Sequence, residues 1–109
     1  MAFFSFVGGD PASRVLTAQG RLNPGDGAAL IEALDRFTGP GGGFTLDLRA
    51  GVPELHPEAL QALREGCEHV SRTSDRATLR VFAPTPLVEE LRSQGADEVP
   101  CLELLAKDD

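Results

Sequence analysis

The sequence predicts a single α/β domain built on a mixed, mainly parallel β-sheet. The chain has 109 residues, a length at which one hydrophobic core is normal and division into domains is rare. Apolar residues make up 41% and charged residues 25%, which is typical of a globular protein and argues against a disordered or fibrous one. After two initial β-prone segments, strand-like and amphipathic helix-like segments alternate, which favours parallel strands joined by crossover helices.

The first two strands are predicted to form a hairpin. Residues 3–7 are apolar and β-prone, and the Gly, Asp and Pro cluster that follows at 8–11 is a strong turn signal. Residues 14–22 then partly alternate between apolar and polar side chains, as a half-buried strand does. A second turn signal ends this strand, and we expect Asp26 to cap a helix that runs to about Thr38.

The next strand, at residues 44–48, follows a glycine-rich segment at 39–43 that we interpret as a linker. A phosphate-binding loop would need Lys and Ser or Thr at the start of a helix, whereas an apolar strand follows here. A second helix is predicted from Pro57, because proline has no N–H to lose at the first helical position. Its apolar residues lie on one stripe that faces the sheet: Leu60, Leu63, Cys67 and Val70.

A strand at residues 77–83, a third helix and a strand at residues 99–105 complete the predicted fold. We expect Thr85 to cap the third helix, with Pro86 at its first position and Gly95 at its end. The predicted order is therefore β-β-α-β-α-β-α-β, with the helices packed on the sheet and the whole chain in one domain.

The charge balance and the apolar runs disfavour two classes of partner. Ten Lys and Arg against seventeen Asp and Glu give a net charge of -7, which disfavours nucleic-acid binding through phosphate neutralisation. The longest apolar run is far below the roughly 20 residues that span a bilayer, and no basic segment precedes the apolar start. We therefore expect a cytoplasmic protein that neither binds nucleic acid nor inserts directly into a membrane.

No residue pattern indicates catalysis, a cofactor or a metal site. Two cysteines, Cys67 and Cys101, make no disulfide framework, and in a reducing compartment we expect them to be small buried hydrophobes. Cys67 and His69 lie two residues apart on a predicted helix, about 200° around its axis, and so cannot bind one metal ion. His56 has carboxylates on both sides, but sequence adjacency is weak support for a general base. We expect a non-enzymatic protein without cofactor or metal.

Three segments together resemble a known family. Residues 14–22 end in Gly-Arg-Leu, residues 46–48 read Leu-Asp-Leu, and residues 81–86 read Val-Phe-Ala-Pro-Thr-Pro before the third helix. Their order and spacing resemble the STAS domain, the fold of bacterial anti-sigma factor antagonists, over about residues 14–105. The resemblance implies the fold predicted above and a protein that acts by binding other proteins.

In that family, a cognate kinase phosphorylates a serine in an Asp-Ser-Ser-Gly loop at the start of the second helix. The matching segment here reads His-Pro-Glu-Ala, and Pro57 and Glu58 occupy the two serine positions without a hydroxyl group. The resemblance therefore implies the interaction surface, at residues 52–63, but no phosphorylation switch in this loop. The candidate partner-binding residues are His56, Pro57, Glu58, Ala59 and Gln61.

The carboxylate of Glu58 has two interpretations. An anion is favoured at a helix entrance, because unsatisfied N–H groups and the helix dipole make that end positive. Glu58 could hold the loop in one electrostatic state that resembles the modified one, although a single carboxylate reproduces neither the charge nor the three acceptor oxygens of a phosphate. Alternatively, Glu58 is a favourable second residue of a helix with no role in binding.

The leading expectation is a scaffold or constitutive binder in a partner-switching pathway that regulates bacterial transcription. By resemblance, the partner would be an anti-sigma factor with a kinase-like ATP-binding fold or another STAS protein, and a homodimer is possible. One alternative is an accessory subunit of a membrane lipid or anion transport system. Phe3, Phe4 and Phe6 could help such a subunit to dock or to dimerise, although packing in the core is the favoured interpretation of these side chains. Another is a small-ligand sensor with an anion at the same helix entrance, where Glu58 would oppose it.

Overall fold

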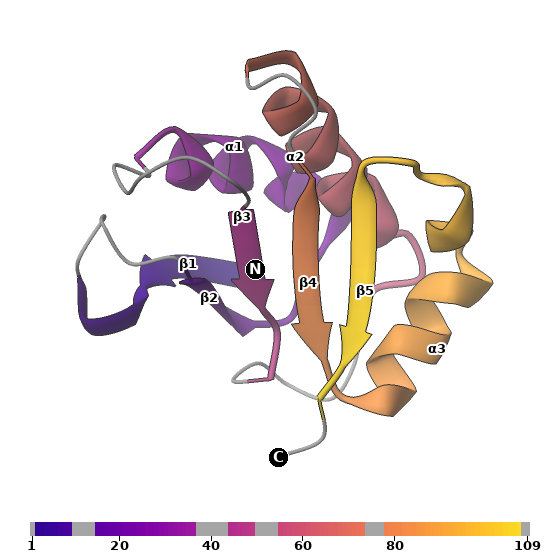
Figure 1. Ribbon diagram of the computed structural model, residues 1–109. Coiled ribbons are helices and arrows are strands. Elements are labelled where there is room, and N and C mark those ends of the chain that lie inside the picture. Colours follow the sequence, from indigo (N-terminus) through magenta and orange to yellow (C-terminus); the bar gives the residue numbers. More distant parts are fainter. Residues whose placement is uncertain (1, 10–14, 37–43, 50–54, 74–77, 108–109) are drawn as a thin grey trace.

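A computed structural model describes residues 2–9, 15–36, 44–49, 55–73 and 78–107. One five-stranded sheet runs in the order β1-β2-β3-β4-β5, with β1 antiparallel to β2 and the remaining neighbours parallel (Figure 1). The predicted α/β class, mainly parallel sheet and N-terminal hairpin are confirmed. The strands are β1 (Ala2–Phe6), β2 (Val15–Gly20), β3 (Phe44–Asp47), β4 (Leu79–Ala83) and β5 (Leu102–Ala106).

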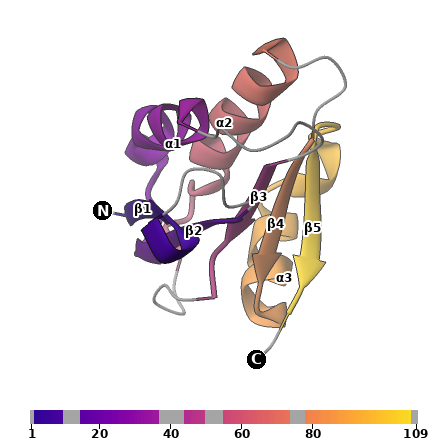
Figure 2. The same cartoon turned by 60° about the vertical axis from the view of Figure 1, so that its left-hand side comes forward.

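Within the described residues, three α-helices lie on one face of this sheet. Helix α1 (Gly27–Asp35), helix α2 (Leu60–Thr73) and helix α3 (Thr85–Ser93) each connect one parallel strand to the next. Parallel crossovers are right-handed, and all three step across the sheet in the same direction, so the helices reach the same face. Figure 2 shows α1 and α2 together on one side of the strands, with α3 behind β4 and β5. The predicted order of elements is confirmed.

Burial alternates along the strands and separates the two faces of the sheet. Leu16, Leu46 and Val81 are 0% exposed and lie on the face that packs against the helices. Their neighbours Thr17 and Arg80 point the opposite way, and they are half-buried and exposed, respectively. No helix in the described ranges covers that opposite face. The core therefore lies between one sheet face and one helix layer.

The two predicted helix caps have different outcomes: Asp26 occupies the N-cap position of α1 but makes no side-chain capping bond, and the prediction of Thr85 as a cap is wrong. Asp26 does precede α1, but its carboxylate accepts hydrogen bonds from the N–H of Asn23 at 2.8 Å and from the N–H of Ala2 at 3.2 Å. Asp26 is only 5% exposed, and a buried carboxylate needs donors, so it ties the start of β1 to the turn before α1. Helix α3 begins at Thr85 itself, and Pro84 occupies the N-cap position.

Other predicted boundaries are confirmed, shifted or outside the described residues. Helix α1 ends at Asp35, with Arg36 at its C-cap position, and so ends before the predicted Thr38. The predicted linker at 39–43 lies outside the described residues. Helix α3 ends before Gly95 as predicted, and this residue has a φ of 105°, which glycine adopts without a steric penalty. Strand β5 begins at Leu102 rather than Val99, because a hydrogen bond from the N–H of Leu102 to the carbonyl of Val99 closes a turn there.

Helices α1 and α2 approach each other closely at Gly66. A Cβ atom at this position would lie 2.6 Å from Cδ2 of Leu30 and 3.3 Å from Cδ1 of Leu34. Both leucines belong to α1, and they are 0% and 3% exposed. Their side chains therefore fill the space that a larger residue at Gly66 would need.

We predict that Gly66→Ala lowers the free energy of unfolding by about 1–2 kcal/mol, because the added methyl group displaces buried Leu30 despite the better helix propensity of alanine. Urea unfolding followed by circular dichroism measures the change. Gly25→Ala is the matched control, since a Cβ there meets no atom within 4 Å. Equal unfolding midpoints for the two variants would contradict the close approach of the helices.

Candidate functional site

The entrance of α2 lies on the surface and contains the residues that the family resemblance singles out. Pro57 and Glu58 are exposed and form a turn immediately before Leu60, the first residue of α2. The helix therefore starts later than predicted from Pro57. The turn is closed by a hydrogen bond from the N–H of Ala59 to the carbonyl oxygen of His56 at 2.9 Å. A tight turn, rather than regular helix, presents Pro57 and Glu58.

The side chains of His56 and Gln94 accept the hydrogen bonds that a Ser or Asp cap would accept at a helix start. Nδ1 of His56 accepts a hydrogen bond from the N–H of Glu58 at 3.0 Å. Oε1 of Gln94, just beyond the last residue of α3, accepts one from the N–H of Leu60 at 2.9 Å. Nε2 of Gln94 also donates to the carbonyl oxygen of His56 at 3.1 Å. The Gln94 amide thus clamps both the turn and the helix start to the end of α3.

Each backbone N–H of residues 58–62 has an acceptor inside the protein. Besides the bonds above, the N–H of Gln61 donates to the carbonyl of Glu58, and that of Ala62 donates to the carbonyl of Ala59, both at 3.1 Å. Helix entrances bind anions through N–H groups that lack such partners. The entrance of α2 is therefore a preformed surface and not an open cradle for an anion.

The predicted partner-binding residues differ in how far they reach the surface. Gln61 is exposed, and the exposed carboxylate of Glu58 makes no hydrogen bond or ion pair with any described residue. His56 is half-buried and occupied by the contacts above. Ala59 is 0% exposed and packs in the core, so its side chain positions the turn instead of contacting a partner. Residues 52–54 of the predicted surface lie outside the described residues.

A hollow of about 450 Å³ adjoins this turn. Pro57 and Glu58 line one side of it, and Gln94 and the first turns of α2 line the rest, including Arg64 and Glu65. Sequence reasoning missed Gln94, because it lies 34 residues after Leu60 and no local pattern links the two. Only the fold brings the end of α3 beside the start of α2.

A salt bridge lies where the chain leaves β3. Nε and Nη2 of Arg49 donate to the carboxylate of Asp47 at 3.0 and 2.9 Å, and the backbone N–H of Arg49 donates to it at 2.9 Å. Burial alone would raise the pKa of Asp47, but these hydrogen bonds and the guanidinium charge outweigh it. The pKa of Asp47 is therefore held below its ordinary value of 3.8.

A lowered pKa in the folded state means that the Asp47 carboxylate stabilises the protein above pH 3.8 and that this stability is lost as the pH falls through the folded pKa. We predict that Asp47→Asn lowers the free energy of unfolding at pH 7 by up to about 1 kcal/mol. The difference from the unaltered chain should disappear well below pH 3.8. Urea unfolding across this pH range measures it.

Asp97→Asn is the control, because Asp97 is 74% exposed and its contact with Arg92 is longer, at 3.5 Å. We expect this variant to differ little from the unaltered chain at any pH. An Asp47→Asn effect that stayed constant from neutral to acidic pH would contradict the role assigned to the carboxylate charge.

Cys67 and Cys101 form a disulfide, so the prediction of two separate buried thiols is wrong. Their Cα atoms are 5.8 Å apart, within the usual range for disulfides, and the bond joins the middle of α2 to the residue before β5. His69 instead pairs with α1, where its Nε2 lies 2.6 Å from Oδ1 of Asp35. Within the described part of the chain, no three His, Cys, Asp or Glu side chains are grouped so as to hold a metal ion.

No protein-family model, curated protein or solved structure matches this chain. The resemblance to the STAS family therefore stays a prediction, with which the order of strands and helices is consistent. Among the helices that the structure describes, none combines the length and the apolar character needed to cross a bilayer. The geometry of the α2 entrance is accordingly the main basis for a functional proposal.

We predict that Gln94→Ala exposes the start of α2 to solvent exchange, because the variant loses the acceptor for the Leu60 N–H and the donor to His56. The free energy of unfolding should fall by about 1–2 kcal/mol, and the Leu60 amide should lose protection in hydrogen exchange. Gln61→Ala, at an exposed position on the same helix, should leave both unchanged. Full protection of the Leu60 amide in the Gln94 variant would contradict the clamp.

Proposed function

We propose that the chain is a non-enzymatic protein-interaction module that docks on a partner through the entrance of α2. It acts as a scaffold or constitutive binder in a partner-switching pathway that regulates transcription. One observation supports this most directly: the turn is exposed while every N–H of residues 58–62 is already satisfied within the protein. Such a surface suits a protein partner better than an anionic ligand.

The docking surface consists of Pro57, Glu58 and Gln61 with the adjoining hollow, and we call it the entrance surface. Its conformation is held by His56 and Gln94, so little ordering of the backbone is needed when a partner binds. The carboxylate of Glu58, which pairs with no residue that the structure describes, favours a basic group at the matching position of the partner. The fixed conformation and the negative charge of the entrance surface therefore favour a partner of complementary shape and charge.

The missing hydroxyl group supports constitutive binding rather than switching. By resemblance, the partner is an anti-sigma factor with a kinase-like ATP-binding fold, which in relatives phosphorylates a serine of this loop. Pro57 and Glu58 offer no acceptor for a phosphoryl group, and Glu58 supplies a permanent negative charge at the exposed turn. The complex would therefore persist without the release that phosphorylation brings.

Site-specific photo-crosslinking in the native host tests the docking surface. A photoreactive side chain at Gln61 lies on the entrance surface, whereas the same group at Gln19 is a matched control on β2 beside Phe3. Capture from Gln61 of a regulatory protein with a kinase-like fold would support the proposal. Capture of a transport subunit, or of the same regulatory protein only from Gln19 beside Phe3, which is 69% exposed, would overturn it.

We predict that Glu58→Arg weakens binding of the captured partner about three- to tenfold, because it reverses the charge at the entrance surface. Glu58→Ser should bind and should become phosphorylated when the partner and ATP are present. Calorimetry measures the affinities, and mass spectrometry locates the phosphate. Equal affinities for all three proteins would show that Glu58 is only a favourable residue at a helix start.

A further inference from the structure

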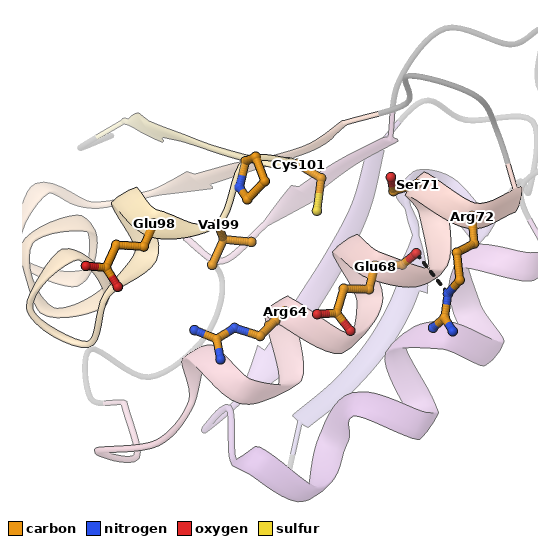
Figure 3. A pocket seen from close by; sticks show the side chains of 8 residues that line it. Arg64, Glu68, Ser71, Arg72, Glu98, Val99 and Cys101 are labelled. Carbon is orange, nitrogen blue, oxygen red and sulfur yellow. Dashed lines mark hydrogen bonds between the residues drawn. The ribbon is translucent and has the colours of Figure 1, made fainter.

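A second hollow, of about 580 Å³, lies between α2 and the segment that leads into β5. Figure 3 shows its two walls, with Arg64 and Glu68 on α2 and Glu98 on the opposite side. Cys101 lies at the rim and points its sulfur toward α2 (Figure 3). The disulfide is therefore adjacent to a cavity that is large enough for a small organic molecule.

The two sulfur-bearing residues differ in access. Cys67 is 0% exposed and lies on the inward stripe of α2. Cys101 is half-buried and lines the hollow. Thiol–disulfide exchange requires a thiolate to reach one sulfur atom along the S–S axis. Because Cys101 lines the hollow and Cys67 is enclosed in the core, Cys101 is the sulfur that a thiolate entering from solvent would attack.

The hollow also offers charged groups of both signs. Arg64 and Arg72 are balanced by Glu68 and Glu98. Among the described residues, the side chains of Arg64, Glu68 and Glu98 make no hydrogen bond or ion pair, while Nε of Arg72 donates to the backbone carbonyl of Glu68 at 3.3 Å. Guanidinium groups bind carboxylates, and carboxylates bind ammonium groups. A small molecule that carries both charges complements this lining.

We propose that this hollow binds a low-molecular-mass thiol bearing carboxylate and ammonium groups, of the chemical class of glutathione, and that this thiol exchanges with the disulfide at Cys101. The thiolate attacks Sγ of Cys101 and forms a new S–S bond. The bond to Cys67 breaks, and Cys67 leaves as a thiolate that takes up a proton. The product is a mixed disulfide at Cys101 and a thiol at Cys67.

A second molecule of the same thiol completes the reduction. Its thiolate attacks the small-molecule sulfur of the mixed disulfide, and Cys101 leaves as a thiolate that is then protonated. Two thiols have become one small-molecule disulfide, and their two electrons have reduced the protein disulfide. Alternatively, the Cys67 thiolate attacks Sγ of Cys101, the bond to the small-molecule sulfur breaks, and the small molecule leaves as a thiolate, which restores the original disulfide. The exchange is thus reversible, and none of its steps requires a partner docked at the entrance surface.

Mass spectrometry of the full chain tests the site. Denatured protein purified without reductant should have no free thiol, because the structure pairs both cysteines. Native protein is then incubated with reduced glutathione, quenched by denaturation in the presence of an alkylating agent, and digested. We expect glutathione on Cys101 and the alkyl group on Cys67. Two free thiols at the outset, an adduct on Cys67, or exchange only after denaturation would overturn the proposal.

The charge recognition has its own test on the unaltered chain. Besides the thiol, cysteamine carries only a cation and 3-mercaptopropionate only an anion. Cysteamine therefore cannot pair with the arginines of the hollow, and 3-mercaptopropionate cannot pair with its glutamates. At equal thiolate concentrations we expect each to exchange at least about threefold more slowly than glutathione. Equal rates for the three thiols would overturn the assignment of the ligand class.

Arg64→Glu should slow exchange with glutathione about three- to fivefold, because it replaces a carboxylate-binding group with a like charge. Arg21→Glu is the matched control, since Arg21 is exposed and does not line the hollow. Equal slowing by the two variants would show a general charge effect and overturn the role of Arg64. If the Arg64 variant fails to fold, the comparison of thiols on the unaltered chain decides.

Discussion

The surface that we propose as functional depends on one amide side chain. Gln94 holds the N–H of Leu60 and the carbonyl of His56 at the same time, so the end of α3 fixes the start of α2. Without it, the N–H of Leu60 would lose its acceptor, the carbonyl of His56 would lose a donor, and the turn would be held less firmly to α3. With it, the backbone groups of the turn are hydrogen-bonded within the protein, and the exposed side chains form the proposed docking surface. Because its N–H groups are bonded within the protein, the entrance of α2 is suited to a partner of complementary shape and not to an anion.

The central position of α2 explains why the disulfide and both hollows lie along this helix. The helix packs against α1 at Gly66, against the sheet through its apolar stripe, and against α3 through Gln94. The disulfide adds a covalent link from Cys67 to the residue before β5. Because α2 is anchored on all these sides, its remaining exposed face is rigid. Both hollows lie along that face, and Arg64 lines each of them.

Local patterns predicted the fold well because they act over a few residues. The stripe of Leu60, Leu63, Cys67 and Val70 identifies the inward face of α2, and each of these residues is buried. Local patterns did not predict hydrogen bonds between residues that lie far apart in the sequence. Asp26 has the sequence position of a cap, yet its carboxylate binds Ala2 and Asn23, and Gln94 caps a helix 34 residues away. The disulfide was missed for the same reason, since composition says how many cysteines exist but not which helix faces which strand.

The shared position of Arg64 makes the two proposals separable in one molecule. Its guanidinium lines the hollow beside Glu58 and also the hollow beside Cys101, so a charge change there alters both electrostatic environments. Glu58 lines only the first hollow, and Cys101 only the second. A change at Glu58 should therefore act on docking without affecting thiol exchange, and removal of the disulfide should do the reverse. If docking responds only to Glu58 and thiol exchange only to the disulfide, the two functions of α2 are independent. If an adduct at Cys101 alters partner affinity, Arg64 is the group through which charge in one hollow reaches the other.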